Sequence, residues 1–227
     1  MWGLFGEWPK RLEVLQKLGP DLNLDFLLAQ ELITGTDVNQ IWEVSKAFQL
    51  PHGYFHSEKT VRGRLEGVAI FSRIPLDSIR NLNLGDGRTM IMGELCTIRG
   101  PLTIASSHLS FTGRQHEQVG RALNAFKGLS ILGADFNDDT ALFNGKLGDW
   151  KLGNDQSNTW PTCGDGYFKT AWEAFSGVPV NFLLEHRRVD HILTRGLEVL
   201  GEETIALEKD GIYASDHSIV ISTLGLP

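Results

Sequence analysis

Cysteine is scarce in this sequence, and so are segments that could direct the chain to a membrane. The 227 residues include two cysteines, Cys96 and Cys163, which form no Cys-x-x-Cys pair, so a zinc ribbon and a thioredoxin-like motif are excluded. No apolar run approaches the ~20 residues that a membrane helix needs, and the N-terminus lacks the basic and long apolar regions of a secretory signal. One disulfide between the two cysteines is the alternative to the two reduced thiols that we expect, together with no membrane span and a cytoplasmic protein.

Positive charge is also in short supply. The chain carries 21 lysines and arginines against 28 aspartates and glutamates, a net charge of −7. A protein that coats a polyanion by charge alone would be basic, so that class is disfavoured, whereas an enzyme that holds a phosphate through a metal ion is not excluded. The densest basic stretch, Lys59, Arg62, Arg64 and Arg73, fits either a solvated loop or a patch that steers phosphates.

The remaining composition is that of a folded protein. Hydrophobic residues make up 41% of the chain and charged residues 22%, which argues against disorder. A chain of this length buries roughly 70% of its unfolded surface and needs no disulfide or structural metal to fold. We find no internal repeat and no low-complexity linker, and we expect a single domain over residues 1–227 that exists as a monomer.

Hydrophobic periodicity predicts a mixed α/β fold. Apolar residues recur at helical spacing in three segments, which run from Trp8 to the break at Gly19-Pro20, from Asp37 to about Phe48, and from Gln115 to Leu129. Short apolar runs bounded by polar residues, glycine or proline predict strands at Asp25–Glu31, Gly67–Arg73, Met90–Ile98, Leu102–His108, Ser130–Asp135, Arg188–Leu193 and His217–Ser222. Residues 137–160 are polar and are expected to be rich in loops.

Polar side chains recur where these strands end. The ionisable and amide groups at those ends are Glu31, His108, Asp135, Asn137, Asp190, Asp216 and His217. Each alone has an ordinary explanation as a cap, a turn or a core histidine, but active sites of layered α/β folds lie at strand ends. The set is rich in carboxylates, and hard divalent cations take oxygen ligands. It therefore indicates Mg²⁺ or Mn²⁺ with a phosphate ester rather than zinc, which would want more histidine or thiolate ligands.

The order of these residues along the chain is more informative than any one of them. Gln-Glu after a strand is followed in turn by Ser-Ser-His-Leu, Gly-Ala-Asp-Phe-Asn, Arg-Val-Asp-His and Ser-Asp-His. This arrangement, which runs from Gln30 to Val220, resembles the endonuclease/exonuclease/phosphatase superfamily of deoxyribonuclease-like, metal-dependent phosphoesterases. The resemblance implies a four-layer α/β/β/α sandwich of two mixed, mostly antiparallel sheets flanked by helices.

For the metal and the attacking water, the resemblance implies four residues. Glu31 and Asp216 match acids of the family's metal site. Asp135 and Asn137 match the pair that positions the attacking water and the phosphate. Hydrolysis of a phosphodiester needs charge relief on the phosphoryl oxygens, which a bound metal ion supplies together with positioning.

For proton transfer, the resemblance implies two histidines and their partners. His217 matches the histidine beside the scissile phosphate, and Asp190 matches the carboxylate that orients it. His108 matches a second catalytic histidine, and Glu66 stands where the deoxyribonuclease branch places that histidine's partner. A carboxylate raises the pKa of a neighbouring histidine, which can then transfer protons near neutral pH. The sequence leaves open whether Asp135 or His217 deprotonates the water.

One part of the family's pattern has no counterpart in the sequence. The family opens with a strand that ends in an asparagine, which reaches the metal or the phosphate, but here the first asparagine is Asn23, after the first expected helix. We therefore expect the opening strand to be missing from this chain, through a misassigned start, a truncation or a loss of the element. Its absence would leave neighbouring strands with an unpaired edge.

The substrate stays open at this stage. We expect a metal-dependent phosphodiester hydrolase that acts on nucleic acid or nucleotides, and the alternative substrates are a phospholipid, an inositol phosphate or a sugar phosphate. An alternative of another class is a catalytically impaired protein that binds phosphate ligands; the missing asparagine favours it, and the retained acids and histidines oppose it. A serine hydrolase built on Ser107 and His108 is disfavoured, because adjacent residues of a strand point to opposite faces and no Gly-x-Ser-x-Gly elbow is present.

Overall fold

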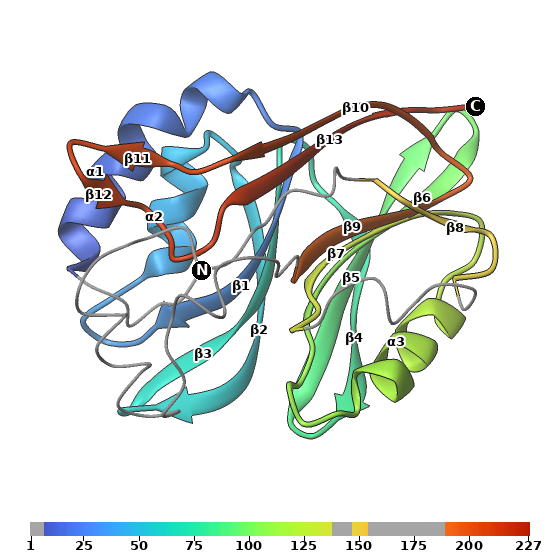
Figure 1. Cartoon of the computed structure of the whole chain (residues 1–227), viewed down its shortest axis with the longest axis horizontal. Helices are drawn as coiled ribbons and strands as arrows, with labels where there is room; N and C mark the ends of the chain where they lie inside the picture. Colours follow the sequence, from blue (N-terminus) through green and yellow to red (C-terminus); the bar gives the residue numbers. More distant parts are fainter. Residues whose placement is uncertain (1–6, 138–146, 154–188) are drawn as a thin grey trace.

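Two β-sheets packed face to face form the centre of the molecule, with helices on their outer faces (Figure 1). The computed structural model describes residues 7–137, 147–153 and 189–227. Helices α1 (Trp8–Leu18) and α2 (Gln40–Ala47) cover one sheet, and helix α3 (Gln115–Asn124) covers the other. The expected α/β/β/α arrangement is confirmed. None of the helices in the described residues is long and apolar enough to cross a membrane.

The strands pair mostly in antiparallel fashion, as expected. The first sheet has the order β1-β3-β2, with β1 (Phe26–Thr34), β2 (His52–Val61) and β3 (Arg64–Ser72). The second has the order β4-β5-β6-β7-β9-β8, with β4 (Asp77–Gly85), β5 (Arg88–Thr97), β6 (Gly100–His108), β7 (Leu129–Asp135), β8 (Trp150–Leu152) and β9 (Asp190–Arg195). Within it, β6 and β7 are parallel. Two ribbons complete the fold, β10 (Glu198–Ile205) with β13 (Ile219–Gly225), and β11 (Glu208–Lys209) with β12 (Ile212–Tyr213).

The side chains of β3 illustrate how the layers are held together. All its residues from Glu66 to Ser72 are buried. Val68 and Ile70 pack in the core between the two sheets, whereas Ala69 and Phe71 pack in the core that includes α1 and α2. Because successive side chains of a strand point to opposite faces, a strand covered on both faces has a continuous apolar sequence.

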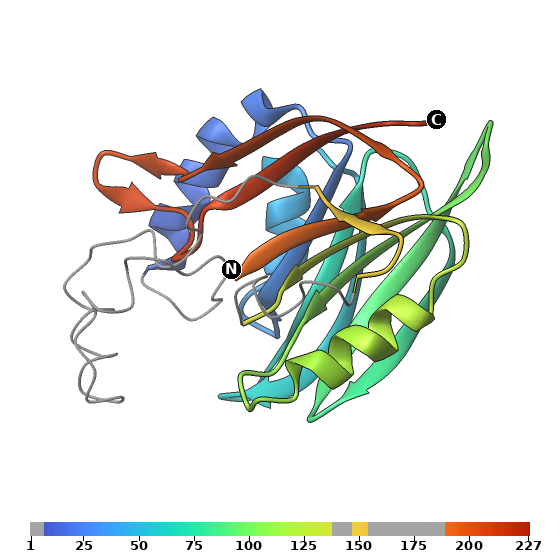
Figure 2. The same cartoon turned by 45° about the vertical axis from the view of Figure 1, so that its right-hand side comes forward.

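Helix α3 lies across the outer face of the six-stranded sheet (Figure 2). Its Val119 and Ala122 share a buried cluster with Met90 and Leu132 of the sheet. The helix ends at Asn124 and not at Leu129 as predicted. The prediction was too long because Gly128 adopts a φ of +71°, outside helical geometry, and Leu129 already belongs to β7.

Several strands have no apolar alternation and were not predicted. Most positions of β4 are exposed, since it lies at the edge of its sheet, and β2 carries mainly half-buried polar side chains. The ribbon strands β10, β11 and β12 were missed for the same reason. The short strand β8 falls in the segment 137–160 that was expected to be loop-rich, of which residues 138–146 and 154–160 lie outside the described residues.

Strand β1 does not end at Glu31, as the sequence suggested, but continues to Thr34. Its pairing with β3 shifts register between Ala29 and Leu32, and Glu31 has a φ of +58°. This irregularity is a β-bulge, a feature that re-aims side chains and is common next to active sites. The bulge, rather than the strand end, sets the direction of the Glu31 side chain.

Among the described residues, β1 pairs with β3 alone and β13 pairs with β10 alone. A cavity of about 440 Å³ is lined by residues 26–30 of β1 and 219–225 of β13, and also by Asp190 and His217. The expectation that the family's opening strand is missing stays a prediction.

Candidate active site

Three neighbouring strands of the six-stranded sheet bring their ends to one edge. β6 ends at His108, β7 ends at Asp135 and β9 begins at Asp190. His108 lies beside Asp135 in the sheet, and Asp135 lies beside Asp190. Since β6 and β7 are parallel and β9 runs the opposite way, the three residues occupy the same end of the sheet, as the sequence led us to expect.

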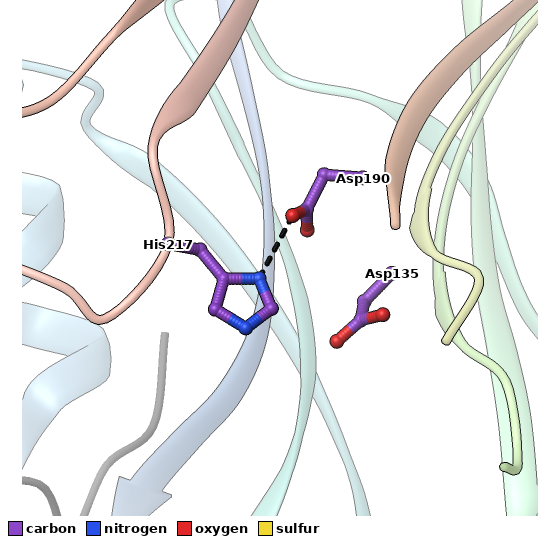
Figure 3. Close-up of side chains that lie close together, drawn as sticks. All are labelled: Asp135, Asp190 and His217. Atoms are coloured by element: carbon purple, nitrogen blue, oxygen red, sulfur yellow. Dashed lines mark hydrogen bonds and ion pairs between the residues drawn. The ribbon is translucent and has the colours of Figure 1, made fainter. Parts of the chain in front are cut away.

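His217 pairs with Asp190 at this edge (Figure 3). Its Nδ1 lies 2.8 Å from Oδ2 of Asp190, and its backbone N–H donates to Oγ of Ser215 at 3.1 Å. Burial acts to lower the pKa of His217, but the charges of Asp190 and Asp216 outweigh it and raise the pKa to about 10. His217 is therefore a cation at neutral pH, and its Nδ1–H donates to Asp190.

Asp135 and Asn137 are joined in one turn after β7. The backbone N–H of Asn137 donates to Oδ1 of Asp135 at 2.8 Å, and Asn137 has a φ of +51°, a conformation that asparagine tolerates. Burial and the charge of Asp190 raise the pKa of Asp135 to about 7. The carboxyl group of Asp135 can therefore take up or release a proton near neutral pH.

Glu31 and Asp216 reach the site from other elements. Oε1 of Glu31, at the bulge of β1, lies 3.9 Å from Nδ1 of His108, and Oδ2 of Asp216, before β13, lies 4.0 Å from Nε2 of His217. Burial raises the pKa of Glu31, and the negative charges of Asp216 and Glu66 raise it further. The acids of the site thus lie close enough to repel one another.

The partner of His108 differs from the one that the resemblance implies. Glu66 forms an ion pair with Lys59, its cross-strand neighbour on β2, with 2.6 Å between Oε1 and Nζ. Nδ1 of His108 instead lies 3.0 Å from Nη1 of Arg88, the first residue of β5. The pairing of His108 with Glu66 was therefore wrong, because the β5–β6 hairpin brings Arg88 to the ring. The wider catalytic role expected for Glu66 stays a prediction.

Arg88 is the site residue that sequence reasoning missed. The sequence did predict the two strands of the hairpin, and their antiparallel register would have carried the start of β5 to the end of β6. A single arginine after a glycine turn gave no signal on its own. The structure brings together all seven strand-end residues named from the sequence, which are Glu31, His108, Asp135, Asn137, Asp190, Asp216 and His217.

The chemistry of these side chains suits a divalent cation. Donor atoms of Asp135, Asp190 and His217 lie within 4.8 Å of one another (Figure 3). Burial and mutual repulsion raise the pKa values of Asp135 and Glu31, and a hard cation would relieve both effects. Because Nδ1 of His217 is already engaged with Asp190, carboxylate oxygens form the better ligand set.

Comparison with known proteins gives a family match and several structural likenesses. The sequence model of the Endonuclease/Exonuclease/phosphatase family matches residues 3–217. No protein of curated function matches the chain by sequence. A family protein from Leptotrichia buccalis C-1013-b has a TM-score of 0.74 at 15% identity, with 99% of this chain and 96% of that chain covered.

Two further solved structures carry named activities or ligands. TDP2 from D. rerio, complexed with a single-strand DNA product, has a TM-score of 0.70 at 17% identity, with 98% of this chain and 94% of that chain covered. A mannosyl-6-phosphatase from Bacteroides thetaiotaomicron VPI-5482 has a TM-score of 0.64 at 16% identity, with 96% and 91% covered. At these identities the likeness shows a shared fold.

The family match spans nearly the whole sequence and agrees with this fold. Members of the family are hydrolases that act on phosphoesters, and they generally depend on a divalent metal ion. A site of acids and histidines at the edge of two packed sheets is consistent with that chemistry. The chain belongs to the endonuclease/exonuclease/phosphatase family.

Proposed function

We propose that this protein is a metal-dependent hydrolase of phosphodiesters that acts on nucleic acid or nucleotides. The observation that carries the proposal is the His217–Asp190 pair, whose donor atoms lie within 4.8 Å of an Asp135 oxygen. A protonated histidine beside a carboxyl group with a pKa near 7 supplies an acid and a base at one place.

His217 is the proposed acid. Asp190 accepts its Nδ1–H, which fixes the ring and keeps it charged. The second ring nitrogen, Nε2, then carries the proton that goes to the leaving oxygen. General acid catalysis of this kind contributes on the order of 10²–10⁴ in rate.

Asp135 is the proposed base for the attacking water. Its Oδ1 accepts the Asn137 N–H, so Asn137 orients the carboxyl group. Its pKa of about 7 lets it accept a proton at neutral pH, where His217 is already protonated. We therefore assign the deprotonation of water to Asp135 rather than to His217.

Glu31 and Asp216 are the proposed ligands of the metal ion, Mg²⁺ or Mn²⁺, through their carboxylate oxygens. When bound, the ion supplies charge relief on the phosphoryl oxygens. Each of these acids lies close to a histidine of the site, since a carboxylate oxygen of Glu31 is 3.9 Å from His108 and one of Asp216 is 4.0 Å from His217. The raised pKa of Glu31 means that a neighbouring cation would stabilise its charged form.

Two observations bear on the substrate. A structural neighbour, TDP2, was solved with a single-strand DNA product, which supports nucleic acid, whereas another is a mannosyl-6-phosphatase, which supports the sugar-phosphate alternative. In the basic stretch noted in the sequence, Lys59, Arg64 and Arg73 each form an ion pair with an acid. This pairing favours an ordinary solvated surface over a phosphate-steering patch. We therefore expect the residues of the active site, rather than this basic stretch, to bind the substrate.

The test is hydrolysis of bis(p-nitrophenyl) phosphate, a single-strand oligonucleotide and mannose 6-phosphate, with Mg²⁺, Mn²⁺ or EDTA. We expect the two diesters to be cleaved with either metal and not with EDTA. Asp190→Asn should lower kcat by about 10²-fold or more, since it weakens the acid. The control is Asp25→Asn, an exposed acid paired with Arg73, which should keep wild-type activity.

Other results would select an alternative. Cleavage of mannose 6-phosphate alone would favour a sugar phosphate as substrate. Binding of inorganic phosphate without turnover of any probe would favour a catalytically impaired phosphate-binding protein. Equal activity of Asp190→Asn and wild type would remove the His217–Asp190 pair from the mechanism.

Three wider expectations also remain proposals. They are a single domain over residues 1–227, a monomer, and a cytoplasmic location. Light scattering of the purified chain would measure its oligomeric state, and cell fractionation would test its location.

A further inference from the structure

A buried polar network lies behind His108, on the Nδ1 side of the ring. Nη1 of Arg88 lies 3.0 Å from Nδ1 of His108 and 3.2 Å from Oε2 of Glu58. Oε1 of Glu58 accepts the backbone N–H of Thr89 at 2.7 Å. Glu58 belongs to β2 in the first sheet, whereas Arg88 and His108 belong to the second sheet. The network therefore joins the two sheets directly behind a proposed catalytic histidine.

The arginine decides which ring nitrogen of His108 carries a proton. A guanidinium group has N–H donors and no acceptor, so its hydrogen bond needs a lone pair on Nδ1. Oε1 of Glu31 would favour a proton at Nδ1, but at 3.9 Å it lies outside hydrogen-bond distance. A charged guanidinium forms a stronger hydrogen bond than a neutral amide donor, so Nδ1 keeps its lone pair and a neutral ring has its proton on Nε2.

The surroundings of Nε2 leave that proton poorly satisfied. Nδ2 of Asn137 lies 2.8 Å from Nε2 and also 2.8 Å from the carbonyl oxygen of Leu109. The amide has two N–H groups, one of which donates to the carbonyl while the other faces Nε2. With a proton on Nε2, that second N–H has to turn away and the ring needs an acceptor, since Oδ2 of Asp135 is 3.6 Å away. An oxygen of a bound phosphate ester is an acceptor that would resolve this conflict.

We propose that Arg88 is a positioning residue that fixes His108 as a neutral ring with its proton on Nε2, from which His108 donates a hydrogen bond to a phosphoryl oxygen of the substrate. The choice of acceptor rests on the proposed function, whereas the contact with Arg88 does not. His108 then stabilises charge on the phosphate by donation and transfers no proton. Burial and the positive charge of Arg88, which hold the pKa of His108 well below its usual value, agree with a neutral ring.

Ring ¹⁵N spectra test the assignment without a substrate. The protonated and unprotonated nitrogens of a neutral imidazole resonate far apart, and the protein has seven histidines. The His108→Gln variant identifies the signals of the His108 ring, because they are missing from the spectrum of this variant. We expect an unprotonated Nδ1 and a protonated Nε2 in the wild type with Mg²⁺. A protonated Nδ1 would overturn the proposal.

Three arginine variants test whether Arg88 is the cause. Arg88→Met removes the donor and should shift His108 toward the other tautomer, whereas Arg88→Lys keeps a cation and an N–H donor and should keep the wild-type pattern. The matched control is Arg80→Met, which removes an arginine paired with Glu94 and should change nothing. If Arg88→Met does not fold, the test is whether Nδ1 of His108 is unprotonated in both the wild type and Arg88→Lys. An unchanged tautomer in folded Arg88→Met would refute the role of Arg88.

Turnover of bis(p-nitrophenyl) phosphate tests the hydrogen bond to the phosphate. Loss of one preorganised donor costs about 10²–10³ in kcat, so His108→Ala should lose about that much and His108→Gln less. Arg88→Met should lower kcat by about 10-fold or more with little change in KM. In a His108→Gln background it should add no further loss, because Arg88 acts through the ring.

The outcomes separate this inference from the proposed function. Additive losses in the double variant would mean that Arg88 acts elsewhere and would overturn its positioning role. If no phosphodiester is hydrolysed while Nδ1 of His108 is unprotonated, the donor role falls together with the proposed function, and the assignment of Arg88 stands.

Discussion

The two histidines of the site are held by partners of opposite charge. Asp190 accepts a hydrogen bond from His217 at 2.8 Å, while Arg88 faces Nδ1 of His108 at 3.0 Å. Both rings lose water, which by itself lowers a histidine pKa, but the acids around His217 reverse the effect. The same type of side chain therefore has a high pKa at one position of the site and a low pKa at another.

The raised pKa of His217 predicts a stability that depends on pH. An unfolded histidine has a pKa near 6.5 and His217 has one of about 10, so its pairing stabilises the fold fully below pH ~6.5 and is lost as the pH rises to about 10. The pKa of Asp135 is raised from 3.8 to about 7, so ionisation of this buried carboxyl group also lowers the stability of the fold as the pH rises, and this second decrease is complete near pH 7. Urea unfolding in EDTA should show a free energy of unfolding that falls between pH 7 and 10, less steeply in His217→Asn. Equal slopes for the two proteins would contradict the pairing.

The raised pKa of Glu31 predicts opposite effects of one substitution with and without metal. Glu31→Gln removes a partly buried charge that Asp216 and Glu66 repel, so it should raise the melting temperature of the metal-free protein. It also removes a proposed ligand, so added Mg²⁺ should stabilise it less than wild type. A ligand at 100 times its Kd stabilises by about 2.7 kcal/mol. Calorimetry with EDTA and with Mg²⁺ measures both effects, and an equal response to Mg²⁺ would remove Glu31 from the metal site.

Among the elements, β2 and β3 show how closely the backbone is packed beside the site. β2 shifts register against β3 between Ser57 and Lys59, next to Gly67. A Cβ atom at Gly67 would lie 1.9 Å from the carbonyl oxygen of His56. Contacts that short do not occur, so one of the two strands would have to move. This is also the stretch that supplies Glu58 and Glu66 to the polar residues behind the site.

Alanine substitutions at two glycines should therefore have opposite effects. Gly67→Ala should lower the free energy of unfolding by about 2–3 kcal/mol, because backbone atoms cannot give way as a flexible side chain would. Gly120→Ala, in α3 with open space around the new methyl group, should raise it by about 0.5–1 kcal/mol. Urea unfolding of both variants measures these changes. A small decrease for Gly67→Ala would contradict the prediction and would mean that β2 can shift relative to β3 at little cost.

Elements could be predicted from the sequence where two packed layers impose a pattern. β3 and the β5–β6 hairpin show apolar runs because both of their faces are covered, and the bounds of their strands were predicted to within three residues. β4 was missed because an exposed edge strand needs no apolar alternation. The bulge at Glu31 was missed because register depends on the partner strand, which periodicity along one strand does not contain.

The whole molecule assembles the site from chain segments that only tertiary structure brings together. Glu31 comes from the first sheet, while His108, Asp135 and Asp190 come from the second. Sequence reasoning could name these residues because their order matched a family, but it could not assign their contacts. Glu66 was predicted to be the partner of His108 only from its position in the sequence, whereas in the structure it forms an ion pair with its cross-strand neighbour Lys59. Contacts of this kind depend on distances between strands that no local pattern encodes.

The overall charge of the molecule predicts how salt affects nuclease activity. A net charge of −7 repels a polyanion, and the basic residues Lys59, Arg64 and Arg73 are paired with acids. Monovalent salt screens this repulsion, since the Debye length falls from about 30 Å at 0.01 M to about 10 Å at 0.1 M. With Mg²⁺ saturating, kcat/KM for a 20-nucleotide single strand should therefore stay level or rise over that range. A dinucleotide, which carries far less charge, is the control and should respond less. A nuclease that binds through a basic track loses affinity steeply with salt, so a steep fall for the long strand would reveal such a track and contradict recognition by the site alone.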